Sequence, residues 1–247
     1  MTQWTNEAAI AQWDAATGRD LMQATADEGD LAKRQLVNEA VFRLIGDVSG
    51  LRVLDAGCGN GYLSRMLAQR GAHVVGVEPA GSMIGFCREK EAELQQGVTY
   101  VQADLCHLPK SAARLDVVVC SMVLMAIPDW KSALHACVDA LRPGGRLVFA
   151  IVHPAFEQLR SVWAEHGEYR VDRYLEEYEI VGPTASDFHR PVSAYLNELC
   201  ALGCRLREVV EPGLDPAVAA AHAATIRGIE SCVRAPNFLI VSADAPA

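Results

Sequence analysis

The sequence lacks the segments that carry a chain into or across a membrane. Its longest apolar run, residues 117–128, is interrupted by Ser121 and is shorter than the roughly 20 residues that a membrane-spanning helix needs. Residues 1–9 are polar and contain neither the basic start nor the apolar centre of a signal peptide. We therefore expect a cytoplasmic protein with no membrane partner.

Clustered positive charge is also missing. The chain has 22 Lys and Arg residues against 31 Asp and Glu residues, a formal net charge of -9, and its basic residues are scattered along the sequence. Proteins that hold nucleic acid through its phosphates present a basic patch or stripe. We therefore expect no nucleic-acid partner.

Sequence patterns of metal and disulfide sites are absent as well. The eight cysteines include no Cys-x-x-Cys pair and lie mostly in apolar stretches, which favours buried, reduced thiols. There is no His-Glu-x-x-His, Walker A or Gly-x-Ser-x-Gly sequence. The sequence therefore predicts a site that needs no metal.

What the sequence does contain is a regular alternation of short apolar runs and helical patterns from residue 51 onward. This alternation is typical of an α/β fold with a doubly wound parallel sheet, and 247 residues suit one domain with an elaboration. The predicted strands span residues 52–56, 73–78, 98–103, 115–122, 146–152, 204–211 and 237–243. The predicted helices span residues 6–17, 31–48, 61–70, 81–95, 130–141, 192–202 and 215–228. A turn is expected at 142–145.

The stretch that organises the chain is Val53-Leu54-Asp55-Ala56-Gly57-Cys58-Gly59-Asn60-Gly61-Tyr62-Leu63. Its glycines occupy the turn between a buried strand and a helix, where α/β sheets bind cofactors. Glycine accepts positive φ at such a turn and lets a ligand approach the backbone. The free N-H groups of the following helix would point at a carboxylate or phosphate of the ligand.

The spacing of this turn argues against a dinucleotide cofactor. A G-x-G-x-x-G/A fingerprint starting at Gly57 would put Tyr62 where close helix packing needs a small residue. Asp55 at the strand end would repel a pyrophosphate, whereas it suits an ammonium group or a hydroxyl. An NAD-dependent oxidoreductase is therefore disfavoured.

The pattern Asp-x-Gly-x-Gly-x-Gly resembles motif I of the class I S-adenosylmethionine-dependent methyltransferases, in particular the type 11-like enzymes of small molecules. The resemblance covers residues 52–153 and, less fully, the C-terminal strands. It implies S-adenosyl-L-methionine as cofactor and S-adenosyl-L-homocysteine as product. It also implies a mostly parallel seven-stranded sheet of order 3-2-1-4-5-7-6 with the last strand antiparallel.

We expect one domain over residues 1–247. Residues 1–50 would form a helical cover, residues 51–153 the cofactor-binding core, and residues 191–247 the C-terminal helices and strand hairpin. Residues 154–190 break the alternation and are rich in aromatic and charged side chains, which predicts a lid over a substrate pocket. An exposed dimerisation element is the alternative, so a monomer or a homodimer is expected.

Residues at the carboxyl ends of neighbouring strands would surround the cofactor. Glu78, about 20 residues beyond the glycine turn, is placed to accept hydrogen bonds from both ribose hydroxyls, unless it is an exposed loop carboxylate. Asp104 matches the family position that reads the adenine amino group, unless it only caps a turn. Trp13 would close over the cofactor or merely anchor its helix. The expected cofactor residues are Trp13, Asp55, Gly57, Cys58, Gly59, Gly61, Glu78, Pro79, Met83, Asp104, Leu105, Ser121 and Met122.

The acceptor is expected beside the end of strand 146–152. His153 there would take a proton from an attacking hydroxyl or amine, or it is a hinge residue bonded to backbone. Met125 would face the reacting methyl group, and Tyr169 and Tyr174 would contact the acceptor from the lid. The expected activity is methyl transfer to an O or N nucleophile of a small molecule, for instance a secondary metabolite. A tRNA or protein methyltransferase and a non-methylating S-adenosylmethionine-binding protein are the alternatives.

Overall fold

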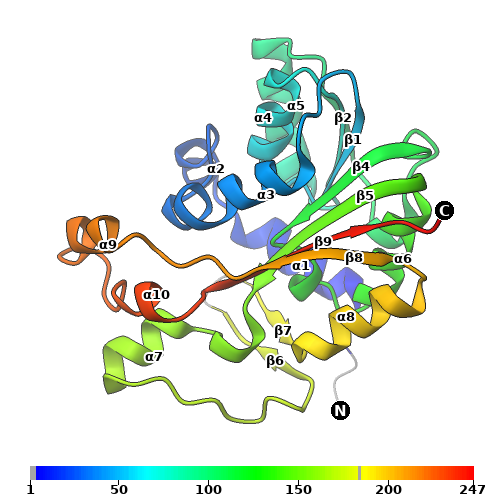
Figure 1. Ribbon diagram of the computed structural model, residues 1–247. Helices are drawn as coiled ribbons and strands as arrows, with labels where there is room; N and C mark the ends of the chain where they lie inside the picture. The colour runs from blue at the N-terminus through cyan, green and yellow to red at the C-terminus, as the bar shows by residue number, and fades with distance from the viewer. Residues whose placement is uncertain (1–3, 183–184) are drawn as a thin grey trace.

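A single mixed sheet forms the centre of the molecule. The computed structural model describes residues 4–182 and 185–247, and its strands run in the order β3-β2-β1-β4-β5-β9-β8 (Figure 1). The strands are β1 (Arg52–Ala56), β2 (His73–Val77), β3 (Thr99–Val101), β4 (Leu115–Ser121), β5 (Leu141–Val152), β8 (Arg205–Val210) and β9 (Phe238–Asp244). The first five are parallel to one another, and β9 is antiparallel to both β5 and β8. The predicted order and the antiparallel last strand are confirmed.

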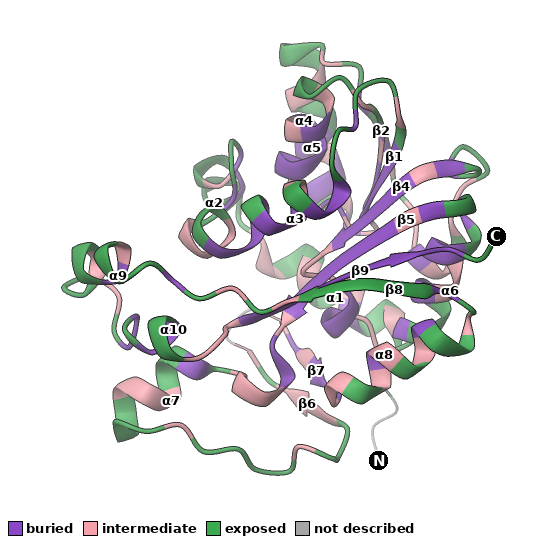
Figure 2. Cartoon of the chain, viewed as in Figure 1, coloured by how far each residue is buried: buried purple, intermediate pink, exposed green. Residues whose placement is uncertain are grey.

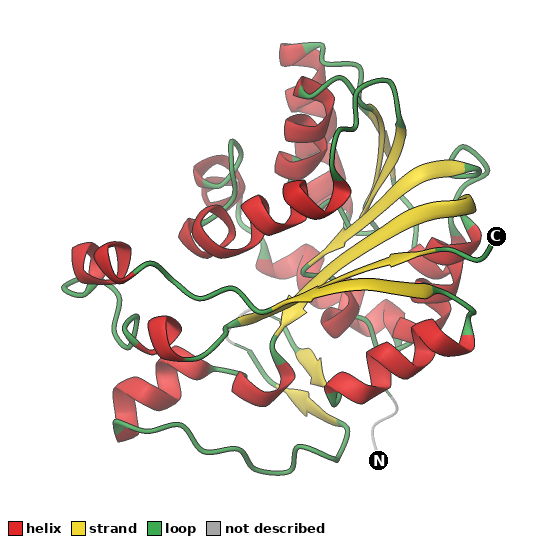
Figure 3. Cartoon of the chain, in the orientation of Figure 1, coloured by secondary structure: helices red, strands yellow, loops and turns green. Residues whose placement is uncertain are grey.

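Helices cover both faces of the sheet because its strands are apolar on both sides (Figure 3). Along β4, Val117 and Val119 pack toward one face, whereas Val118 packs toward the other. The first face carries α3 (Asn38–Ile45), α4 (Tyr62–Gln69) and α5 (Gly81–Leu94). The second face carries α6 (Trp130–Asp139) and α8 (Val192–Ala201). The central strands are consequently buried along most of their length (Figure 2).

Two predicted elements, the turn at 142–145 and the helix 215–228, differ from the structure, and each region contains a glycine in close contact with backbone. Strand β5 begins at Leu141, so the expected turn at 142–145 is an irregularity within the strand. A Cβ at Gly145 would lie 2.9 Å from the Arg142 carbonyl oxygen, so the chain makes this close approach only with glycine. The expected helix 215–228 ends early, at His222, and the chain beyond it passes so close to Arg160 that a Cβ at Gly228 would lie 2.1 Å from the Arg160 carbonyl oxygen. In its place are α9 (Pro216–His222) and α10 (Ser231–Arg234).

The N-terminal region forms a cover beside α5. It consists of α1 (Asn6–Ala16), the unpredicted α2 (Arg19–Ala24), and a π-helical turn, η1 (Lys33–Val37), that leads into α3. Both α1 and α2 contact α5, and Met22 and Ala26 are buried against Met83 and Phe86. None of the described helices is both long and apolar enough to cross a membrane.

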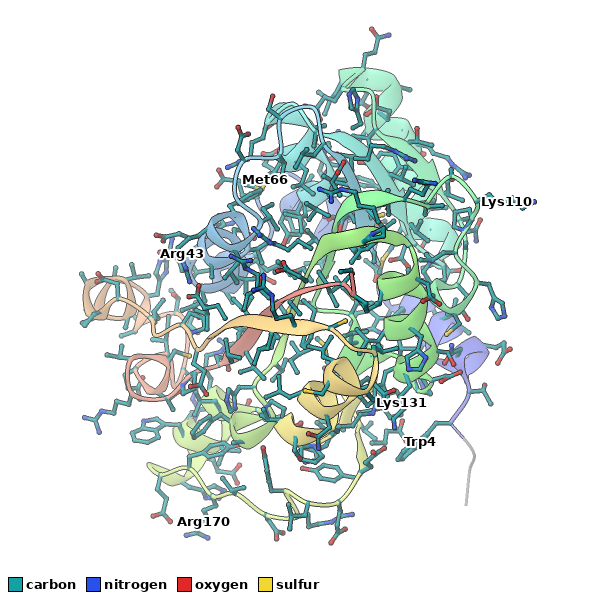
Figure 4. The ribbon with its side chains drawn as sticks, turned by 45° about the vertical axis from the view of Figure 1, so that its right-hand side comes forward. Trp4, Arg43, Met66, Lys110, Lys131 and Arg170 are labelled. Atoms are coloured by element: carbon teal, nitrogen blue, oxygen red, sulfur yellow. The ribbon has the colours of Figure 1, made fainter. Side chains whose placement is uncertain are left out.

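The inserted segment after β5 contains secondary structure separate from the central sheet. It contains the short turn η4 (Pro154–Phe156), helix α7 (Leu159–His166), and the strands β6 (Tyr178–Ile180) and β7 (Asp187–His189), which pair antiparallel. Helix α7 contacts α10. Arg170 marks the loop at the outer edge of this segment, away from the central sheet (Figure 4). The other short turns of the chain are η2 (Leu105–His107) and η3 (Leu124–Ala126).

Candidate functional site

A cavity of about 420 Å³ lies at the carboxyl end of the sheet, between the strand-end loops and the N-terminal cover. Its walls come from the glycine turn, the loops after β2, β3 and β4, and helices α1 and α2. We call it the first cavity. Eleven of the thirteen expected cofactor residues line it: Trp13, Gly57, Cys58, Gly59, Glu78, Pro79, Met83, Asp104, Leu105, Ser121 and Met122.

The glycine turn has the backbone shape that its sequence predicts. Gly57, Gly59 and Gly61 have φ of 74°, 54° and 77°, a region that L-residues with a Cβ avoid. A Cβ at Gly57 would lie 2.5 Å from a methyl carbon of Val123, which follows β4. At Gly59 the nearest atom would be Met83 Sδ at 3.9 Å, so the space beside Gly59 belongs to the cavity. The turn is thus packed tightly on one side and open on the other.

Glu78 places a buried carboxylate on the wall of the first cavity. Its Oε2 accepts a hydrogen bond from the Gly59 backbone N-H at 3.0 Å, and its Oε1 accepts one from the Ala80 backbone N-H at 2.9 Å. Burial raises the pKa of Glu78 to about 7, while these two hydrogen bonds oppose the rise. Each carboxylate oxygen keeps a lone pair for a ligand, because each accepts only one of these bonds.

Asp104 places a second carboxylate on the same wall, just beyond β3. Its Oδ1 accepts from the Cys106 backbone N-H at 3.0 Å, and its Oδ2 accepts from Asn6 Nδ2 at 3.2 Å. Asn6 belongs to α1, and its Oδ1 also accepts from the Asp129 backbone N-H at 3.0 Å. Asp104 therefore caps a turn and also joins the cover to the cavity wall.

Two expected cofactor residues, Asp55 and Gly61, do not line the first cavity. Asp55 is buried beneath the turn, where its Oδ2 accepts from Ser64 Oγ at 2.6 Å. Burial raises the pKa of Asp55 to about 6, and the Ser64 hydrogen bond opposes that rise. Gly61 is the N-cap of α4, with Tyr100, Arg65 and Cys87 packed where its side chain would be. Both residues shape the turn from behind.

The loop after β4 forms the wall nearest to the inserted segment. Met122 has φ of 63°, which is unusual for a residue with a side chain and costs of order 1–3 kcal/mol. Its backbone N-H donates to the Ala150 carbonyl of β5 at 2.7 Å, which holds this conformation. Met125 and Ile127 also line the first cavity.

The N-terminal cover is attached to the cavity by polar contacts. Trp13 lines the cavity, and within the described chain its indole N-H has no hydrogen-bond partner. The next residue, Asp14, accepts from the Ser82 backbone N-H at 2.7 Å and so caps α5, whose own N-cap, Ala80, has no capping side chain. Asn60 of the glycine turn donates to the Met22 carbonyl at 2.9 Å.

Three residues expected to contact the acceptor lie elsewhere. His153 is buried outside the first cavity, its Nδ1 accepts from the Ala155 backbone N-H at 3.1 Å, and its Nε2 lies 2.7 Å from Glu211 Oε1. Because Nδ1 accepts, Nε2 carries the proton and donates it to Glu211, so neither ring nitrogen is available to take a proton from a ligand. This geometry matches the hinge alternative. Tyr169 donates to the Glu157 carbonyl at 2.7 Å, and Tyr174 Oη accepts from the Val192 backbone N-H at 3.1 Å, both away from the cavity wall.

The sequence did not point to several polar residues of the first cavity. They are Asn6, Thr17, Thr25, Asp30, Lys33, Asn60 and Asp187. All but Asn60 come from the cover or the inserted segment, where no motif marks them. Among the described residues no group of three His, Cys, Asp or Glu side chains is arranged to hold a metal ion.

Comparison with known proteins shows which proteins this chain resembles in sequence. Residues 54–149 match a family described as a methyltransferase domain. The chain is 33% identical over 147 residues to the ubiquinone biosynthesis O-methyltransferase of Alkalilimnicola ehrlichii, a match that spans 58% of this chain and 59% of that protein. A protein of the same name from Photorhabdus laumondii is 36% identical over 114 residues, 46% of this chain and 48% of the relative. The chain thus matches less than two thirds of the length of these relatives.

Solved structures extend the similarity beyond the core. An S-adenosylmethionine dependent methyltransferase from Mesorhizobium loti is 29% identical, with a TM-score of 0.70 that covers 83% of this chain and 96% of that one. The [4+2]-cyclase SpnF has a TM-score of 0.69 over 98% of this chain and 97% of its own, but at 18% identity that likeness extends to the fold alone. The strand order and the glycine turn agree with these comparisons: residues 54–149 match a methyltransferase domain, and the fold is that of class I S-adenosylmethionine-dependent methyltransferases.

Proposed function

We propose that this protein transfers a methyl group from S-adenosyl-L-methionine to a hydroxyl oxygen of a small molecule. One observation carries the proposal. The carboxylates of Glu78 and Asp104 follow two neighbouring strands, β2 and β3, and line one cavity together with the open side of the glycine turn.

The residues of the first cavity suit this cofactor group by group. Glu78 keeps lone pairs for two ribose hydroxyls, and Asp104 keeps them for an amino group on a purine ring. Met83 and Leu105 offer apolar surfaces to a flat base. Gly59 leaves open the space that a side chain would fill. A volume of about 420 Å³ also falls in the usual range for ligand pockets.

Methyl transfer requires the protein mainly to hold the two reactants in the correct relative position. When bound, S-adenosyl-L-methionine supplies an electrophilic methyl group on a positively charged sulfur. Holding two reactants in line can lower a barrier by about 7–11 kcal/mol. Met122, Met125 and Ile127 give the wall after β4 an apolar surface, which solvates a sulfonium charge poorly and so favours its discharge.

Oxygen is the acceptor atom that the comparisons favour, since both curated relatives named above are called O-methyltransferases. A small acceptor is favoured over tRNA or a protein by the net charge of -9 and by the inserted segment that borders the cavity. These arguments support a small hydroxylated molecule as the substrate class.

Calorimetric titration with S-adenosyl-L-methionine, S-adenosyl-L-homocysteine and NAD tests the cofactor. We expect the first two to bind and NAD not to bind. Glu78→Gln should weaken binding about 10- to 100-fold, since hydrogen bonds to a charged group are lost, whereas Glu165→Gln, on the surface of α7, should leave it unchanged. Binding of NAD alone would overturn the proposal.

A second candidate function follows from the likeness to SpnF, because a fold of this type also carries a cyclase. In that case the protein would bind S-adenosyl-L-methionine without consuming it. Mass spectrometry separates the two: formation of S-adenosyl-L-homocysteine together with an acceptor heavier by one methyl group requires methyl transfer.

A further inference from the structure

A second cavity, of about 430 Å³, adjoins the first beneath the inserted segment. The two share three wall residues, Met125, Val152 and Asp187. The remaining walls of the second cavity come mainly from residues 154–161, 180–182 and 187–190, together with Tyr195 and Asn237. It is thus a compartment next to the expected cofactor site, and those three residues line both cavities.

Asp187 is the acidic residue at this junction. It is the first residue of β7, and its Oδ1 is buried with no hydrogen-bond partner in residues 4–182 and 185–247. A buried carboxylate oxygen without a donor is costly for a folded protein, so a ligand that brings a donor gains that energy. Burial raises the pKa of Asp187 to about 6, and the nearby Glu157 carboxylate raises it further in the same direction.

The other titratable groups beside Asp187 are paired with one another. His189 Nε2 donates to the Tyr174 carbonyl at 2.8 Å, and its Nδ1 lies 2.8 Å from Glu157 Oε1. Whether the shared proton is on Nδ1 or on Glu157, the pair carries no net charge. Asp187 is therefore the carboxylate at the junction whose charge no partner within this cluster balances.

Two cations of the surrounding walls, Arg190 and Lys33, have partners, while Arg160 also lines the second cavity. Arg190 donates to the carbonyls of Leu124 at 3.3 Å, Ile127 at 2.9 Å and Pro128 at 3.1 Å, and its Nε lies 3.9 Å from Glu177 Oε2. On the first-cavity side, Lys33 Nζ lies 3.6 Å from Asp30 Oδ2.

We propose that the second cavity holds the methyl acceptor and that Asp187 removes the proton from the acceptor hydroxyl as the methyl group is transferred; this proposal rests on the function proposed above. The O-H bond breaks with its proton passing to Asp187, and an oxygen lone pair forms the new O-C bond. The S-C bond breaks with its electron pair remaining on sulfur, which becomes a neutral thioether. The proton leaves Asp187 for water when the product departs.

The acidity of the base selects the class of hydroxyl. A carboxylate whose pKa is raised by burial to about 6 lies much closer in pKa to a phenol, near 10, than to an aliphatic alcohol, which is about as weakly acidic as water. General bases work efficiently when this difference in pKa is small. The acceptor assigned to this cavity is therefore a molecule with an acidic hydroxyl, a phenol or an enol, held against the apolar side chains of Met125, Val152 and Phe188.

The position of Asp187 is fixed from both sides. The backbone N-H of Ser186 donates to Gln12 Oε1 of α1 at 3.1 Å. On the other side, the ring of Phe188 lies 5.0 Å from the ring of Trp4. A base that must reach one hydroxyl needs such support, because small displacements of a catalytic group cost large factors in rate.

The test uses two acceptors of similar size and different acidity, catechol and cis-1,2-cyclohexanediol, with S-adenosyl-L-methionine and detection of the methyl ether by mass spectrometry. The wild-type protein should methylate catechol and leave the cyclohexanediol unchanged. Asp187→Asn should lower kcat/KM for catechol by about 100-fold or more, the usual contribution of a general base. Asp172→Asn, an exposed lid carboxylate, is the matched control and should not change it.

A third acceptor separates a base from a merely structural residue. The hydroxyl of 4-nitrocatechol ionises near neutral pH, so it needs no base, and the deficit of Asp187→Asn should shrink to less than about tenfold. An equal deficit on both catechols would assign Asp187 a structural role and overturn the proposal. So would methylation of the cyclohexanediol in preference to catechol, or no methylation of any phenol.

Calorimetry keeps this proposal distinct from the function on which it rests. Asp187→Asn should bind S-adenosyl-L-methionine as the wild type does, because Asp187 borders the cofactor cavity only at its junction with the second. If the wild type fails to bind the cofactor, the proposed function fails. If the wild type binds it and the catechol results contradict those above, only the assignment of Asp187 and its cavity fails.

Discussion

The two adjoining cavities are built in opposite ways. The sheet-side wall of the first, which we call backbone-built, contains Gly57 and Gly59 of the glycine turn, two strand ends and Met122 in an unusual backbone conformation, while side chains of α1 and α2 line the opposite wall. The second is formed mainly by side chains of a long insertion, held together by contacts such as that of Glu157 with His189. A site shaped by backbone changes little when single residues are substituted, so it keeps fitting one ligand. A site shaped by side chains changes its fit with each substitution. The difference suits a constant cofactor and a variable acceptor.

The largest expected effect breaks the backbone-built site at Gly57. Gly57→Ala must place a Cβ at 2.5 Å from Val123 with φ of 74°, which should lower the free energy of unfolding by about 4 kcal/mol. Gly59→Ala meets nothing closer than Met83 Sδ at 3.9 Å and should cost only about 1 kcal/mol, while its methyl group enters the cavity and weakens cofactor binding. Urea denaturation and calorimetry measure the two effects. Equal losses of stability would contradict this account of the turn.

The next effect concerns the electrostatic cost of the same site. The pKa of Glu78 is raised in the folded protein from 4.5 to about 7. The contribution of protonated Glu78 to the free energy of unfolding is therefore full below about pH 4.5 and is lost as the pH rises through about 7. The cost at pH 8 is about 3 kcal/mol, at one pKa unit per 1.36 kcal/mol. Glu78→Gln should therefore show a smaller fall in unfolding free energy between pH 5 and pH 8 than the wild type in urea titrations. If the unfolding free energies of the two proteins depended on pH in the same way, the electrostatic cost assigned to Glu78 would be refuted.

The smallest effect tests how the cover is attached to the first cavity. Asp14 caps α5 from another helix, and the Ser82 backbone hydrogen bond lowers the pKa of Asp14. Asp14→Ala should cost about 1 kcal/mol, the usual value for a lost N-cap, whereas Asp27→Ala, on an exposed carboxylate of the same cover, should cost nothing measurable in thermal unfolding. A loss shared by both variants would point to a general charge effect instead of the cap.

The backbone-built half was accessible from the sequence because its signals are local. A glycine turn after an apolar run fixes where a cofactor lies, and strand ends bring Glu78 and Asp104 to the same edge. Asp55 and Gly61 were the exceptions in this half, since the motif marks residues that support the turn but does not show that they lie behind it and not on the cavity wall.

The side-chain-built half was not accessible for a geometric reason. Val152 lines both cavities, and the next residue, His153, turns away from them, as successive residues of extended chain do. A prediction that places a residue at a strand end therefore leaves its direction open. Asp187 is one of many acidic residues in the insertion. It is distinguished only in the folded chain, where Glu157 and His189, 32 positions apart, pair with each other and leave Asp187 Oδ1 without a partner among the described residues.

The position of β9 has a consequence for the order in which the chain folds. Strand β9 lies between β5 and β8 and is buried at all of its residues, although β8 precedes it along the chain. During synthesis β8 has no hydrogen-bonding partner in the sheet until residue 244 has left the ribosome. The edge of β5 is exposed for the same interval. Nascent chains shorter than this should present two open strand edges at once, the state in which a growing sheet is most prone to pair with another chain.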